Sequence, residues 1–218
     1  MTARVVVLAA PSGGGKTTIT RELRRRLPDA FGYSVSATTR KARPDERDGE
    51  AYHFLTRDEF LRRLGAGEFL ERAEYAGELY GTLRSEVERV LKSGRDVVLD
   101  VEVQGARQVR RAYPPPASVV IFVIPPSARV LIERLRQRRT ETEAEVRRRI
   151  DIAAQEAETA LRELGSVYDY VVVNDDLEKA VREVIDLVQG RGATSRSPKD
   201  MTDLLSAFVR QLKTGQRT

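Results

Sequence analysis

The stretch Ala10-Pro11-Ser12-Gly13-Gly14-Gly15-Lys16-Thr17-Thr18 decides the fold of this chain. It follows an apolar run over residues 5–9, which is typical of a buried strand, and it precedes Ile19, Leu23 and Leu27, which recur at helical spacing. Consecutive glycines in a turn between strand and helix let backbone N–H groups point inward, and the helix start adds partial positive charge. The stretch therefore predicts a phosphate-binding loop.

Two side chains of this loop carry the expected chemistry. Lys16 would reach the β- and γ-phosphates of a nucleotide, and the Thr17 hydroxyl would hold Mg²⁺. The full pattern begins with glycine, where this chain has Ala10, a difference of one methyl group that the closely spaced glycines tolerate. The alternative is a glycine-rich turn with a chance lysine, and the strand before it and the helix after it argue against that interpretation.

The composition bounds the kinds of chemistry open to the chain. Its 218 residues suffice for one well-buried α/β core with smaller appendages, but hardly for two domains. The chain has no cysteine, which excludes disulfides, thiolate metal sites and cysteine nucleophiles. Its one histidine, His53, cannot build a zinc site and is expected to be structural. Chemistry must come from carboxylates, arginines, hydroxyls and the loop.

Charge and hydropathy bear on partners and location. The sequence has no run of eighteen apolar residues and no charged-then-apolar leader, so we expect a cytoplasmic protein with no membrane partner. The net charge of +5 comes from arginines spread along the chain. Aromatic residues make up only 6% and do not alternate with basic ones, so a nucleic-acid partner is not indicated. Monomer and homo-oligomer both stay open.

Strands alternate with helices along much of the chain. The alternation predicts an α/β fold with a doubly wound, parallel, five-stranded sheet that binds ligands at the carboxyl ends of its strands. Residues 36–83 interrupt this alternation with short strands, one helix and a predicted turn at Tyr80-Gly81-Thr82. This pattern predicts a small α+β subdomain inserted between two parts of the larger domain. The buried strands are expected near residues 5–9, 32–39, 97–101, 118–124 and 168–173.

The composition changes again beyond Gly190. Residues 191–199 are rich in Gly, Ser, Arg and Pro and are typical of a linker. A short amphipathic helix follows, and because a helix of that length is marginal alone, its apolar stripe must cover either its own domain or another subunit. The stripe consists of Leu204, Leu205, Phe208, Val209 and Leu212.

Asp100 comes directly after the apolar run Val97-Val98-Leu99. An acidic residue at a strand end beside a phosphate loop can orient Mg²⁺ through water or contact a substrate. An exposed carboxylate with no role is the alternative.

The chain resembles the bacterial type of guanylate kinase, a P-loop nucleoside monophosphate kinase, in segments that occur in the same order. They span residues 4–189, and as a set they are far more specific than the phosphate loop, which alone would indicate only a nucleotide triphosphatase or kinase. The segments cover residues 10–17, 34–40, 43–46, 49–52, 69–71, 80–82, 99–105 and 173–176.

This resemblance implies an enzyme that uses ATP and Mg²⁺ to phosphorylate GMP and dGMP to GDP and dGDP in purine nucleotide metabolism. It implies a kinase domain over residues 1–190, with residues 191–218 as an appendage whose removal should leave the activity largely intact. Within the domain, the core comprises residues 1–35, 84–133 and 157–190, the GMP-binding subdomain residues 36–83, and a helical lid residues 134–156.

The resemblance also assigns residues to the ATP side. Lid arginines would stabilise the moving phosphoryl group, namely Arg134, Arg138 and Arg149. Arg139 stands where the family has glycine, and Arg147 and Arg148 make the register ambiguous, so a neighbouring arginine is an open alternative. Asn174 would help hold the adenine, although capping of the last helix explains it equally well. The ATP-binding set is Ser12, Gly13, Gly14, Gly15, Lys16, Thr17, Thr18 and Asn174.

On the GMP side the implied residues suit the ligand. Guanine has acceptors at O6 and N7 and donors at N1 and N2, so a selective pocket needs hydroxyls and carboxylates. By resemblance, Glu71 and Asp100 accept from the N–H groups, while Ser36 and Thr82 donate to O6. A solvated charged loop is the alternative for the residues assigned to the monophosphate, which are Arg40, Arg43, Tyr52 and Tyr80, with Glu46 bracing the arginines.

Two other functions use related folds. A scaffold module would bind phosphorylated peptides and make no product, but such modules degrade the phosphate loop, whereas Lys16 and Thr17 are intact here. A kinase acting on a phosphorylated sugar would have no use for the guanine set.

Overall fold

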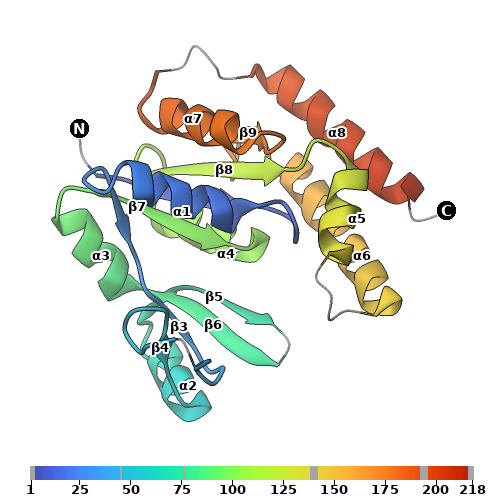
Figure 1. Cartoon of the computed structure of the whole chain (residues 1–218). Coiled ribbons are helices and arrows are strands. Elements are labelled where there is room, and N and C mark those ends of the chain that lie inside the picture. Colours follow the sequence, from blue (N-terminus) through green and yellow to red (C-terminus); the bar gives the residue numbers. More distant parts are fainter. Residues whose placement is uncertain (1–2, 45, 76, 138–141, 192–195, 216–218) are drawn as a thin grey trace.

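The central sheet has five parallel strands in the order β2-β7-β1-β8-β9 (Figure 1). The computed structural model describes residues 3–44, 46–75, 77–137, 142–191 and 196–215. The predicted doubly wound sheet is confirmed. Its strands are β1 (Val5–Ala9), β2 (Phe31–Tyr33), β7 (Asp96–Val101), β8 (Ser118–Ile124) and β9 (Tyr170–Val173).

Helices cover both faces of this sheet. Alternate residues of the fully buried β1 point into two separate cores, which explains why this strand is a continuous apolar run. One core includes α1 (Lys16–Arg26) and α7 (Leu177–Val188). The other includes α3 (Arg84–Lys92), α4 (Val103–Ala112) and α6 (Glu143–Arg162).

A second, smaller sheet is built from residues within 36–83. Its strand order is β4-β3-β6-β5, and it lies below the central sheet in Figure 1. Helix α2 (Arg57–Gly65), capped by the Thr56 side chain, packs against it, and the Phe60 and Phe69 rings stack at 4.3 Å between centroids. The strands are β3 (Ser36–Thr38), β4 (His53–Phe54), β5 (Phe69–Tyr75) and β6 (Glu78–Leu83).

Two predictions about this region are wrong in detail. The strand expected over residues 32–39 is divided, because the chain leaves the central sheet after Tyr33 and enters the small sheet at Ser36. Tyr80-Gly81-Thr82 is not a turn but the middle of β6. Gly81 is needed there for close packing, since a Cβ would lie 2.7 Å from the Phe69 ring.

The C-terminal helix α8 (Pro198–Gly215) covers the chain's own domain. It packs against α5 (Ala128–Arg136) and α6, and its apolar stripe joins the same core as Ala153 and Ala157. Gln211 accepts a hydrogen bond of 3.1 Å from the Ala128 backbone, and Lys213 pairs with Glu158. Of the two alternatives for the stripe, the structure therefore shows the first.

Helices α5 and α6, hereafter the α5–α6 arm, carry most of the predicted lid. Helix α6 is continuous over 20 residues, so the expected boundary between residues 156 and 157 falls inside a helix. Among the described residues, no helix combines the length and the hydropathy needed to cross a membrane.

This packing changes the expectation for the appendage. Leu205 is 0% exposed, so Leu205→Ala should lower the free energy of unfolding by about 2–5 kcal/mol. Removal of residues 191–218, which we expect to leave the activity largely intact, should destabilise the protein further, because it takes away the whole apolar stripe of α8. Urea unfolding measures both, with Arg210→Ala, at an exposed position of the same helix, as the control. The prediction is contradicted if the free energy of unfolding of Leu205→Ala lies within about 0.5 kcal/mol of the value for the unmodified chain. A difference of that size is roughly the effect of a neutral surface substitution.

Candidate functional site

The predicted phosphate loop lies at the carboxyl edge of the central sheet. Leu8 of β1 is in register with Asp100 of β7, and Asn174 directly follows β9, so both polar residues reach the same edge as the loop. In Figure 1 this edge faces the α5–α6 arm on one side and the small sheet on the other. The carboxyl edge is where doubly wound sheets bind ligands.

The loop backbone depends on its glycines. Gly15 has φ of 91°, and a Cβ there would lie 2.1 Å from Asn174 Nδ2. A Cβ on Gly14 would lie 2.7 Å from the Ala10 methyl group, so this glycine is what makes room for the alanine at the first position. Helix α1 begins at Lys16 without a side-chain cap and without an acidic residue in its first turn, which leaves its N–H groups to an anion.

Lys16, Thr17 and Asp100 meet beside the loop. Thr17 Oγ1 donates to Asp100 Oδ2 at 2.5 Å, and Lys16 Nζ lies 3.6 Å from Asp100 Oδ1. A hydroxyl and a carboxylate next to bound phosphates are oxygen donors of the kind that Mg²⁺ prefers. The donor set therefore fits this cation.

A cavity of about 320 Å³ adjoins the loop. Asn174 Nδ2 donates to Gly14 O at 3.1 Å, and Arg134 Nη2 donates to Asn174 O at 3.1 Å. Arg134 Nη1 is buried and has no hydrogen-bond partner among the described residues. A buried guanidinium N–H without a partner is unusual in a folded protein and indicates a place for an anionic ligand. The cavity is lined by Gly13, Gly15, Thr18, Arg134, Asn174, Asp175 and Leu177.

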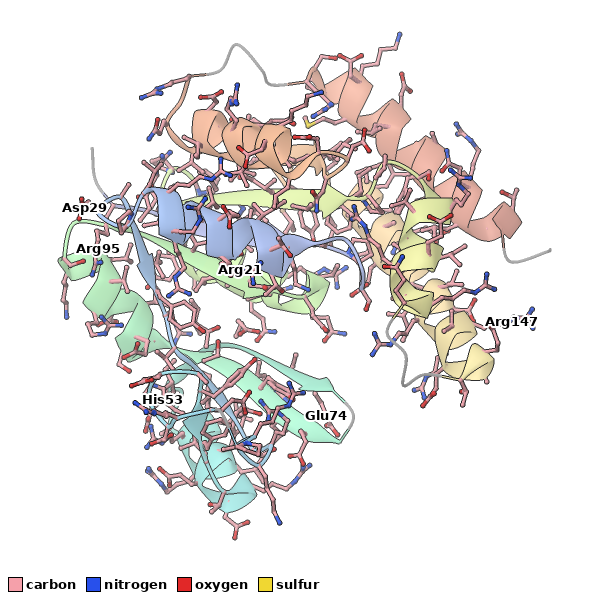
Figure 2. The ribbon with its side chains drawn as sticks, in the orientation of Figure 1. Arg21, Asp29, His53, Glu74, Arg95 and Arg147 are labelled. Atoms are coloured by element: carbon pink, nitrogen blue, oxygen red, sulfur yellow. The ribbon has the colours of Figure 1, made fainter. Side chains whose placement is uncertain are left out.

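The structure separates the clustered arginines of the α5–α6 arm. Arg149 Nη1 donates to Ser12 Oγ at 3.3 Å, whereas Arg147 and Arg148 are exposed, and Arg147 points away from the two sheets (Figure 2). Geometry thus favours Arg149 over its neighbours, which the sequence left open. Arg138, also predicted to act, lies outside the described residues.

A larger hollow of about 1360 Å³ lies between α5, α6 and α8. Two of its arginines are engaged in ion pairs, Arg129 with Glu133 and Arg136 with Glu143. None of the described residues that line it belongs to the phosphate loop or to the small sheet. The predicted chemistry therefore converges on the smaller cavity.

Ser36, Thr82 and Glu71 form one row across the small sheet. Thr82 pairs with Ser36 on one side and with Glu71 on the other. Directly paired residues point to the same face, so two hydroxyls and a carboxylate share it. A register shift between Phe69 and Glu71 brings Glu71, rather than Leu70, opposite Thr82.

Glu71 is buried and held in place. Thr82 Oγ1 donates to Glu71 Oε1 at 2.6 Å. Burial raises the pKa of Glu71, and the hydrogen bonds from Thr82 oppose that rise. Gly105 gives the carboxylate its room, since a Cβ on Gly105 would lie 2.7 Å from Glu71 Oε2.

The residues predicted to bind a monophosphate lie beside this row. Arg40 makes two hydrogen bonds to Glu46, of 2.9 and 2.8 Å, and Glu46 also accepts from the Arg43 backbone at 2.8 Å. These bonds, first of all those from Arg40, lower the pKa of Glu46 to about 2, so it stays ionised. The Tyr52 and Tyr80 rings meet edge to face at 6.1 Å.

Tyr52 is partly buried, and burial is the main cause of its raised pKa. His53, by contrast, lies in β4 (Figure 2), and its Nε2 is buried without a hydrogen-bond partner among the described residues.

One partly buried carboxylate was missed by the sequence reading. Glu156 lies on α6, and its Oε2 is buried without a hydrogen-bond partner among the described residues. Burial, followed by the negative charge of Glu102, raises the pKa of Glu156 to about 7, while Lys16 acts in the opposite direction. The available signal was helical spacing: Glu156 follows Arg149 by two turns and shares its face.

This pKa predicts a pH dependence of stability. The folded protein keeps a proton on Glu156 that the unfolded chain releases above pH 4.5, so the contribution is complete below pH 4.5 and is lost as the pH rises to about 7. Glu156→Gln does not titrate. Relative to the unmodified protein, the variant should therefore gain about 3 kcal/mol of unfolding free energy between pH 4.5 and pH 7.

Urea unfolding at intervals across that range measures the difference, with Glu158→Gln on the same helix as the control. If the curves of Glu156→Gln and the unmodified protein run parallel with pH, Glu156 does not titrate in this way.

Comparisons with known proteins agree on one family. A sequence model of guanylate kinase matches residues 2–191. The chain is 43% identical over 213 residues to a guanylate kinase of Thermotoga maritima, covering 98% of this chain and 99% of the relative. It is 47% identical over 189 residues to a guanylate kinase of Symbiobacterium thermophilum, covering 87% and 86%.

A solved structure is also similar. The crystal structure of guanylate kinase from Anaplasma phagocytophilum is 30% identical, with a TM-score of 0.65 and coverage of 94% of each chain. The family match includes both sheets and the α5–α6 arm and stops before α8.

Proposed function

Because the chain belongs to the guanylate kinase family, we propose that it transfers the γ-phosphoryl group of ATP to GMP, with ATP at the phosphate loop and GMP on the small sheet. The resemblance predicted from the ordered segments is confirmed at the level of the family. dGMP, which has the same base, is proposed as a second acceptor. The cytoplasmic location stays a prediction.

The choice of GMP as the acceptor rests on the row of Ser36, Thr82 and Glu71 on the small sheet. Many kinases share a phosphate loop, but a buried carboxylate at the end of a row of two hydroxyls matches the donors and the O6 acceptor of guanine. Adenine lacks the N1–H donor and would leave the buried Glu71 without a partner, which costs about 1–3 kcal/mol or more for a charged group.

Thr82 and Asp100 complete the proposed base site. Asp100 accepts from a guanine N–H together with Glu71. Because a hydroxyl has one proton, and Thr82 donates it to Glu71 here, donation to O6 requires Thr82 to turn toward the ligand. Ser36 is the second proposed donor to O6.

Positively charged side chains are proposed to stabilise the transfer of the phosphoryl group. The attacking oxygen of GMP is already anionic, so no general base is required, and the obstacle is repulsion between two polyanions. Lys16, Arg134 and Arg149 supply positive charge on the ATP side, and Arg40 and Arg43 supply it on the GMP side. Arg138 is proposed to act with them, as the resemblance implies.

Thr17, directly, and Asp100, through water, are the residues proposed to hold Mg²⁺. When bound, the cation neutralises negative charge on the phosphates. The 2.5 Å hydrogen bond between the two side chains supports this assignment, because it holds both oxygens beside the loop.

An assay over several acceptors tests the function. ADP formation is measured with GMP, dGMP, AMP, UMP and ribose 1,5-bisphosphate in turn. We expect GMP and dGMP to be used and AMP to be used at least about a hundredfold less efficiently in kcat/KM. Preference for the bisphosphate would favour a sugar-phosphate kinase, and lack of turnover with every acceptor would favour a binding module.

A further inference from the structure

Strand β5 contacts both parts of the molecule. Phe69 belongs to the apolar core of the small sheet, whereas its neighbour Leu70 is buried in the larger core, which also holds Val103 and Ala106 of α4. Successive residues of a strand point to opposite faces, so β5 lies between the two cores. The strand that carries Glu71 is therefore anchored to the central domain as well as to the small sheet.

One side chain of α4 holds the outer edge of β5. Gln108 accepts a hydrogen bond from the Arg72 backbone N–H at 3.2 Å and donates one to the Arg72 carbonyl at 3.2 Å. Because β5 is the last strand in its sheet, these two backbone groups have no neighbouring strand to bind. Gln108 also donates to Gln104 O at 3.3 Å, so three bonds fix the orientation of its amide.

Helix α4 also lies next to the second carboxylate proposed for the base. Asp100, in β7, precedes the first residue of α4, Val103, by three positions. The first turn of α4 meets Glu71, since a Cβ on Gly105 would lie 2.7 Å from Glu71 Oε2. One helix thus connects two carboxylates that come from different sheets.

A fixed separation between these two carboxylates matters for guanine. The N1–H and N2–H donors belong to one rigid ring, so two acceptors can bind them together only at a set distance from each other. Asp100 is fixed by the central sheet, whereas Glu71 depends on how β5 is docked. The bonds from Gln108 to the next residue, Arg72, are therefore well placed to set the position of Glu71.

We propose that Gln108 is a positioning residue for the selection of guanine: by binding both backbone groups of Arg72 it fixes β5 against α4 and holds Glu71 at a set distance from Asp100. This inference rests on the proposed function and names a residue that determines the specificity of its base site. Gln108 is not proposed to contact GMP and acts through β5.

Gln108→Met tests this role, because methionine has a similar size and lacks both the N–H donors and the oxygen of the amide. We expect the KM for GMP to rise at least about tenfold and the preference for GMP over AMP to fall, while the KM for ATP stays within about threefold. Gln155→Met is the matched control, since Gln155 is exposed on α6. It should keep both KM values within about twofold.

An unchanged KM for GMP in Gln108→Met would overturn the proposal. A rise in both KM values with an unchanged preference for GMP over AMP would also overturn it, because that pattern indicates a structural role alone. If the unmodified protein does not use GMP, the proposed function fails, and the role of Gln108 in selection fails with it. Use of GMP by the unmodified protein separates these two failures.

Amide hydrogen exchange measures the contact independently of activity. In the protein without nucleotide, the Arg72 amide should be protected, and in Gln108→Met it should exchange at least about tenfold faster. The Thr39 amide, which donates to Leu79 O at 3.0 Å within the small sheet, should keep its rate in both proteins. The proposal is wrong if the Arg72 amide of the unmodified protein exchanges as fast as in an unstructured peptide, or if its rate is the same in both proteins.

Discussion

Lys16→Met is expected to lower kcat for GMP phosphorylation by about a thousandfold or more. Lys16 begins helix α1 at the end of the phosphate loop, and its Nζ lies 3.6 Å from Asp100 Oδ1. It is proposed to move to the β- and γ-phosphates, where its charge is needed most as the γ-phosphoryl group leaves. Methionine has a similar length and no charge, so the loop should keep its shape.

Steady-state ADP formation at saturating GMP measures this effect. Lys92→Met is the matched control, because Lys92 is exposed on α3 and pairs only with Glu88 among the described residues. It should keep kcat within about twofold. If Lys16→Met retained a tenth of the activity or more, the loop would not be the site of phosphoryl transfer.

Glu71→Gln is expected to lower kcat/KM for GMP by about a hundredfold. Glutamine can still accept the Thr82 hydrogen bond, so the small sheet should fold. Its NH₂ group, however, would face the N–H groups of guanine as donor against donor, in a site that excludes water. The value of kcat/KM for AMP should change little, so the preference of the enzyme for GMP over AMP should fall by a similar factor.

Competition between GMP and AMP in the same assay measures this change. Glu74→Gln is the control on the same strand, since Glu74 is exposed near the far end of β5 (Figure 2). A Glu71→Gln enzyme that distinguished GMP from AMP as well as the unmodified one would place guanine recognition elsewhere.

The phosphate loop could be predicted from the sequence because everything that forms it is local. A buried strand, closely spaced glycines and a helix start follow one another within residues 5–27, and no distant contact is needed to specify them. Even the departure at Ala10 could be interpreted locally, since the glycine that makes room for its methyl group, Gly14, is four residues away.

The row on the small sheet could not be derived in this way. Ser36 meets Thr82 through pairing between strands far apart in the sequence, and a register shift in the neighbouring strand β5 decides that Glu71 faces Thr82. The resemblance supplied these residues, whereas their spacing did not. The division of the strand near Tyr33 was missed for the same reason, because it depends on which sheet each half joins.

The sequence shows which face of a helix is apolar, but it does not show which part of the protein that face contacts. The apolar stripe of α8 was evident, yet the choice between its own domain and another subunit needed the contacts of Leu205 and Leu212 with the α5–α6 arm. Glu156 was overlooked because a single carboxylate on a long polar helix is usually solvated. Sequence spacing places Glu156 on the same face of α6 as Arg149, but it does not show that Glu156 Oε2 is buried there.

Calorimetric titration of ATP and GMP, each alone, into the unmodified protein, Lys16→Met and Glu71→Gln tests most directly whether two nucleotides bind at two separate places. We expect Lys16→Met to lose affinity for ATP and to keep its affinity for GMP, and we expect Glu71→Gln to do the reverse. Loss of the same nucleotide in both variants, or of both nucleotides in each, would contradict this expectation.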